Sequence, residues 1–138
     1  MALTYKAAFP QEPNVGVATI TTANTATDGS TGTYTDVWTA GADGARLLSV
    51  IAVARATVTA TAVRLFRKLS GGNYVYWKDG LIAAHTLANT TANAGIVTIH
   101  QYADDPDQSE FEAGEIVAAT TAVDLAGGIS ITAVGNDY

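Results

Sequence analysis

Two histidines, His85 and His100, are the side chains in this sequence that ordinarily titrate near neutral pH, which makes them the first candidates for acid–base chemistry. Nucleophilic hydrolysis needs a serine or cysteine held by such a base. The sequence has no cysteine and no Gly-x-Ser-x-Gly turn that would present a serine. His100 continues the alternation of Ile96 and Thr98, the more polar side of a strand-like stretch. We therefore expect both histidines at the surface or at an interface, and no enzymatic activity.

Acidic side chains gather in residues 104–115, which hold six of the 13 acids: Asp104, Asp105, Asp107, Glu110, Glu112 and Glu115. Glycoside cleavage needs two carboxyl groups on opposite sides of a sugar, and Ca²⁺ needs several oxygen ligands. Pro106 interrupts the segment, and no glycine stands at the turning position of a helix-loop-helix calcium site. We interpret the segment as an exposed connection with solvated carboxylates and expect no metal and no cofactor. A polysaccharide-cleaving acid pair and a calcium site are the alternatives.

Glycine pairs and aromatic residues form two further kinds of candidate site. Gly41 and Gly44 lack the Lys-Ser or Lys-Thr of a phosphate-binding loop, and residues 71–72 precede a strand, so both glycine pairs indicate turns. Flat rings suit apolar sugar faces, and a candidate platform consists of Trp38, Tyr74, Tyr76 and Trp77. Strand alternation puts Tyr74 and Tyr76 on one face and Trp77 on the other, so we expect at least one of these sets in the core.

Length and charge exclude several classes of protein. A chain of 138 residues favours one domain. A formal net charge of -6 repels a phosphate backbone, so we expect no nucleic-acid partner. The absence of cysteine excludes disulfides and thiolate zinc sites. The most apolar stretch, residues 47–54, is far shorter than the roughly 20 residues of a membrane-spanning helix, and the first ten residues lack the apolar run of a secretory signal. We expect no membrane association, and synthesis in the cytoplasm.

Alternation with a period of two recurs along the chain and predicts about nine short strands. The predicted strands are residues 15–21, 34–40, 46–58, 63–69, 74–77, 81–87, 96–102, 115–124 and 129–134. Glycine-rich turns separate them, with Asp79-Gly80 as a tight turn after residue 77. Short strands at this spacing indicate an all-β fold. We predict a single-domain antiparallel β-sandwich over residues 15–138, jelly-roll-like, with an extended N-terminal arm over residues 1–14.

The exterior of such a sandwich is rich in hydroxyl groups and poor in charge. Alanine and threonine together make 46 of the 138 residues, and only 14% of the residues are charged, against roughly 25% in typical soluble domains. A surface with so little charge is more typical of a protein that is buried in an assembly than of a free monomer.

Several strand and turn segments resemble a group of small virion proteins of tailed bacteriophages and prophages. The similar segments are residues 22–29, 32–34, 38–46, 63–66 and 133–138. The acidic segment and His85 depart from the group's pattern. The resemblance brings no catalytic or ligand residue. It implies a capsid decoration (cement) protein on the virion surface, which binds the major capsid protein of the assembled head and self-associates, with a trimer as one form.

Partner contacts are expected in two places. One is the arm, through Tyr5, Lys6, Phe9 and Pro10, and the other is the loop of residues 24–33, through Asn24 and Asp28. The alternative function is a tail or fibre-associated module that binds host surface glycans through Trp77 or Trp38.

Overall fold

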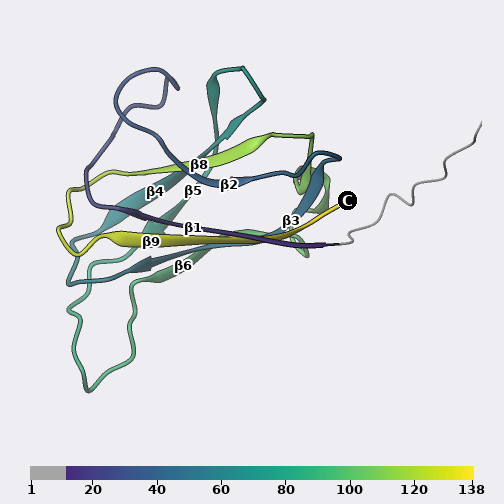
Figure 1. Ribbon diagram of the computed structural model, residues 1–138. Helices are drawn as coiled ribbons and strands as arrows, with labels where there is room; N and C mark the ends of the chain where they lie inside the picture. The colour runs from purple at the N-terminus through teal and green to yellow at the C-terminus, as the bar shows by residue number, and fades with distance from the viewer. Residues whose placement is uncertain (1–11) are drawn as a thin grey trace, which may run out of the picture.

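Two antiparallel sheets pack face to face in the computed structural model, which describes residues 12–138 (Figure 1). Within that range there is no α-helix, and no helix has the length and hydrophobicity to cross a membrane. The elements are β1 (Glu12–Ile20), β2 (Thr35–Thr39), β3 (Ala45–Ala54), β4 (Thr61–Lys68), β5 (Tyr74–Ile82), β6 (Ile96–Gln101), the 3-10 turn η1 (Pro106–Gln108), β7 (Glu110–Phe111), β8 (Ile116–Thr121) and β9 (Ile129–Asp137).

The strand order is that of a jelly roll. One sheet has the order β1-β9-β3-β6, with the short β7 added to β3, and the other has the order β2-β8-β4-β5. The pairs are nested, because β1 pairs with β9, β2 with β8, β3 with β6 and β4 with β5, as in one long hairpin that has been rolled up. The predicted all-β, jelly-roll-like antiparallel sandwich is confirmed.

The core lies between the sheets and contains many small side chains. Leu47 and Val50 of β3 and Ile131 of β9 face Leu65 of β4 and Val117 of β8, and all are buried. Alanine fills much of the remaining space, so the abundance of alanine has a packing role. The buried alanines are Ala40, Ala45, Ala52, Ala54, Ala118, Ala119 and Ala133.

Several predicted boundaries shift in the structure. Strand β1 begins at Glu12 and pairs with β9 from there, so residues 12–14 belong to the sheet. Strand β5 runs through Asp79-Gly80, the predicted turn, because Gly80 keeps a negative φ and pairs with Val63 of β4. Residues 83–95 form a connection that pairs only through an isolated bridge at His85, and the two-residue β7 has no counterpart among the predicted strands.

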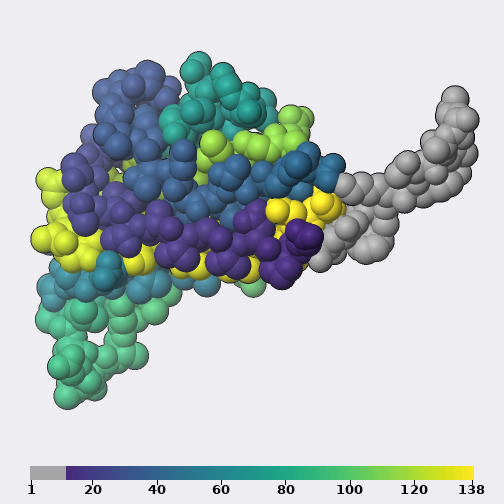
Figure 2. All heavy atoms as spheres, in the orientation of Figure 1, coloured from purple at the N-terminus to yellow at the C-terminus, as the bar shows by residue number. Residues whose placement is uncertain are grey.

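Two long connections extend from the sandwich. Residues 21–34, between β1 and β2, fold over the outer face of the four-stranded sheet (Figure 1). There the Tyr34 ring stacks on Tyr74 at 4.7 Å between centroids and meets Phe66 edge-on at 4.8 Å. Residues 83–95, between β5 and β6, project away from the sandwich on the side of the five-stranded sheet (Figures 1 and 2).

Candidate functional site

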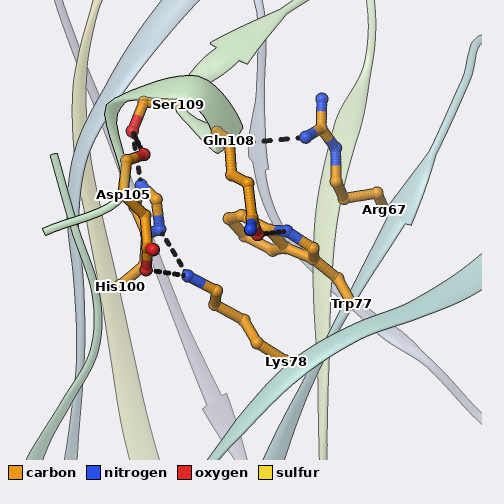
Figure 3. Close-up of polar contacts among 7 residues, drawn as sticks. All are labelled: Arg67, Trp77, Lys78, His100, Asp105, Gln108 and Ser109. Atoms are coloured by element: carbon orange, nitrogen blue, oxygen red, sulfur yellow. Dashed lines mark hydrogen bonds and ion pairs between the residues drawn. The ribbon is translucent and has the colours of Figure 1, made fainter.

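The densest group of polar contacts lies beside β5 and β6, the last strands of their sheets (Figure 3). Strand β5 supplies Trp77 and Lys78, and β6 supplies His100. The turn around η1 brings Asp105 and Ser109 against them. Lys78 and His100 are 22 residues apart in the sequence, and the jelly roll brings β5 and β6 together.

A chain of hydrogen bonds determines the protonation of His100. Lys78 Nζ lies 3.0 Å from His100 Nδ1 and 2.8 Å from Asp105 Oδ2. On the other side of the ring, His100 Nε2 lies 2.9 Å from Ser109 Oγ. The Ser109 hydroxyl donates its own hydrogen to the backbone oxygen of Asp105 at 2.8 Å. The Nε2–H group therefore donates to Ser109, and Nδ1 accepts from the ammonium group.

The environment keeps His100 neutral. Burial, followed by the positive charge of Lys78, lowers the pKa of His100 from 6.5 to about 4. The hydrogen bond from Lys78 lowers the pKa of Asp105 as well. The predicted surface position of His100 is wrong, since the side chain is 1% exposed. A β-bulge explains the difference: the register between β3 and β6 shifts between Val50 and Ile51, which turns His100 inward opposite Val50.

The hydrogen bond between His100 and Ser109 has the opposite direction to the one that activates a nucleophilic serine. A general base must accept the serine proton, whereas His100 donates to Ser109. The carboxylate of Asp105 contacts Lys78, and Ser109 is fully buried. The cluster therefore fastens the η1 turn to β5 and β6.

A second cluster surrounds Arg67 of β4. Its Nε contacts Glu115 Oε1 at 2.7 Å, and its Nη2 donates to the backbone oxygen of Glu110 at 3.0 Å. The guanidinium lies 3.9 Å from the centroid of the Phe111 ring and 5.4 Å from that of Trp77. Because a buried carboxylate is costly without a partner, this ion pair is what allows Glu115 to be buried.

The interpretation of residues 104–115 as a solvated connection is therefore wrong in part. Arg46 pairs with Glu110, Arg67 with Glu115 and Lys78 with Asp105. The pairing of β7 with β3 draws the segment against the sandwich, where these three cations meet it. Among residues 12–138 no group of three or more His, Asp or Glu side chains is placed to hold a metal ion.

The four candidate aromatic residues separate into buried and exposed ones. Trp38 is 2% exposed and belongs to the core, and Trp77 packs against the core beneath Arg67 and Lys78, so neither forms an open platform. The expectation that one set fills the core is confirmed. Tyr76 is 37% exposed and lines a shallow hollow of about 320 Å³ with Thr27 and Arg64.

Residues expected to contact a partner have different surroundings. Tyr5, Lys6, Phe9 and Pro10 lie outside the described residues. The Asn24 side chain is buried inside its loop, where its amide donates to the backbone oxygens of Thr31 and Thr33, both at 3.1 Å. Asp28 is exposed, and its carboxylate accepts hydrogen bonds from Thr31, Ser30 and Tyr34 that hold its pKa well below the usual range. Asn24 thus shapes the loop, and Asp28 lies on its surface.

No protein-family model, curated protein or solved structure matches this chain. Its function therefore has to be inferred from the chemistry of its own clusters and surfaces.

Proposed function

We propose that this protein is a structural component of a tailed-bacteriophage virion, a capsid decoration protein that binds the major capsid protein of the assembled head and stabilises the shell. One observation carries the proposal. In residues 12–138 the ionisable groups of both clusters bond one another, Lys78 with His100 and Asp105, and Arg67 with Glu115, although the latter pair also borders a shallow hollow of about 350 Å³. Such clusters hold a fold together and leave its outer surface to interact.

The fold and the composition also support this function. Jelly-roll sandwiches are frequent among viral capsid proteins and among lectins. A charged fraction of 14% suits a surface that is covered by neighbouring subunits in an assembly. A decoration protein stabilises a shell by mass action, because it binds the assembled state more tightly than the free subunits. Repetition on a shell multiplies a weak contact many times, so no deep pocket is required.

The test is a binding experiment with shells. Purified protein is mixed with assembled heads that lack it and, separately, with unassembled major capsid protein, and bound protein is measured by sedimentation. We expect binding to assembled heads only, together with a higher temperature of head disruption. Failure to bind heads, or equal binding to free subunits, would contradict the proposal.

A glycan-binding tail or fibre module is the second candidate, and the Tyr76 hollow is the observation that favours it. An exposed ring beside the Arg64 guanidinium has the chemistry of a sugar subsite, with a flat apolar face and hydrogen-bond donors. A glycan array probes this directly. Specific sugar binding that is lost in Tyr76→Ala, combined with no binding to heads, would replace the decoration function by this one.

A further inference from the structure

The outer face of the five-stranded sheet carries no charged side chain over its central rows. Four strands, β1, β9, β3 and β6, each contribute three residues to this face, and their pairing aligns them in rows across the sheet. We call this surface the uncharged face. Its residues are Val15, Val17, Thr19, Ser130, Thr132, Val134, Ser49, Ile51, Val53, Ile96, Thr98 and Gln101. All of them are exposed or half-buried.

Charged residues stand at the ends of this face and on the opposite face of the sandwich. Along β3 the charged residues nearest to the uncharged face are Arg46, which precedes Ser49, and Arg55, which follows Val53. The outer face of the four-stranded sheet, in contrast, has Arg64 paired in register with Asp79, and the connection of residues 21–34 covers part of it. The uncharged face is bare within the described chain, although six of its residues are valine or isoleucine.

The connection of residues 83–95 extends this surface. It contains no Asp, Glu, Lys or Arg and includes Leu87, which is exposed. It projects on the same side as the uncharged face (Figures 1 and 2). A partner seated on the sheet would therefore meet an uncharged flank as well.

We propose that the uncharged face binds a second copy of this chain, with the two faces packed against each other about a two-fold axis. The charge distribution selects this occupant. Two molecules that each carry a net charge of -6 repel one another, so they associate most readily through a surface on which no like charges meet and none is desolvated. A basic partner would instead be attracted to the acidic surfaces. Alternating valine, isoleucine, threonine and serine are self-complementary, because apolar groups pack while hydroxyls donate and accept.

The size of the face indicates a weak dimer. Four strands about 4.8 Å apart and three rows about 6.7 Å apart give roughly 400 Å² of flat area per copy. A standard interface buries about 800 Å² per partner, so the face and its flank support a reversible association. A closed trimer needs two different patches on each copy, whereas one flat self-complementary face contacts one partner and gives a dimer.

The experiment measures self-association of the full chain by analytical ultracentrifugation over a wide range of concentration. We expect a reversible monomer–dimer equilibrium. Val17→Lys and Val17→Glu change the net charge in opposite directions, yet each buries a charge at the contact, so both should weaken dimerisation at least about tenfold. Thr98 lies in the same row as Val17, at the opposite edge of the face, so Thr98→Lys should also weaken dimerisation.

Leu81→Lys is the matched control. Leu81 is 65% exposed on an edge strand of the other sheet, and Val17 is 64% exposed on β1. The control should dimerise like the unmodified protein, and circular dichroism should show that every variant is folded. A protein that stays monomeric, forms a trimer, or is weakened equally by Leu81→Lys would overturn the inference. The experiment uses free protein, so its outcome is independent of binding to heads.

Discussion

Acidification is expected to destabilise this protein through His100 before most of its carboxylates are protonated. The buried ring accepts a hydrogen bond from the Lys78 ammonium at Nδ1 and donates one to Ser109 from Nε2. A second proton on the ring would have to bind Nδ1, where it would face the ammonium. That proton replaces a hydrogen bond by repulsion between two donors.

The magnitude follows from the pKa of His100. Burial and Lys78 lower it from 6.5 to about 4 in the folded protein, whereas the unfolded chain regains the ordinary value. Between these values the unfolded chain binds a proton that the folded protein does not. The contribution of His100 to the free energy of unfolding is therefore largest above pH 6.5, and it is lost as the pH decreases to about 4. Since one pKa unit corresponds to about 1.36 kcal/mol, the loss through this group is about 3 kcal/mol.

Urea denaturation at a series of pH values, on the unmodified protein and on His100→Gln, isolates this effect. Glutamine offers an acceptor toward Lys78 and a donor toward Ser109 but does not titrate in this range. All other groups titrate alike in both proteins, so the two curves of stability against pH should diverge by about 3 kcal/mol between pH 7 and pH 4. Parallel curves, or an NMR titration that gives His100 its ordinary pKa, would refute the reasoning.

Three other substitutions test the remaining structural contacts. Arg67→Met leaves the buried carboxylate of Glu115 without its cation, so urea denaturation should show a loss of about 3 to 5 kcal/mol, partly recovered when Glu115→Gln is added. Gly29→Ala should lower the melting temperature more than Gly71→Ala: both glycines have positive φ, but only the first would place a Cβ against a backbone oxygen of β5, at 1.9 Å. Asn24→Ala removes three hydrogen bonds inside its loop, and faster amide hydrogen exchange confined to that loop is the expected result, whereas unchanged exchange would contradict its shaping role.

The strand pattern was predictable because burial on one face of a sheet leaves a period-two signal. The alternation in β4 and β9 is visible in the sequence and recurs in the burial of these strands, whereas β3 has apolar residues on both of its faces. The pairing order was not predictable residue by residue, since it depends on contacts between distant strands. Asp79-Gly80 misled the prediction for a local reason. This dipeptide makes a tight hairpin turn only with positive φ, and Gly80 instead adopts an extended conformation in β5.

The clusters were harder to predict than the strands. A single β-bulge opposite Val50 moves His100 from the surface to the interior, and strand alternation alone gives no sign of it. The partners of Glu115 and Asp105 come from β4 and β5, far away along the chain. The uncharged face did leave a signal, because residues 15–19 of β1, 96–101 of β6 and 130–134 of β9 contain no Asp, Glu, Lys or Arg. Recognising that these strands lie in one sheet required the pairing.

The measurement that tests the proposed function most directly is cryo-electron microscopy of particles made by the genome that encodes this chain. The account predicts density for the jelly-roll sandwich at regular positions on the outside of the head shell, absent from particles in which the chain is deleted. Density for the sandwich at the tail tip alone, or its absence from the particle, would contradict it.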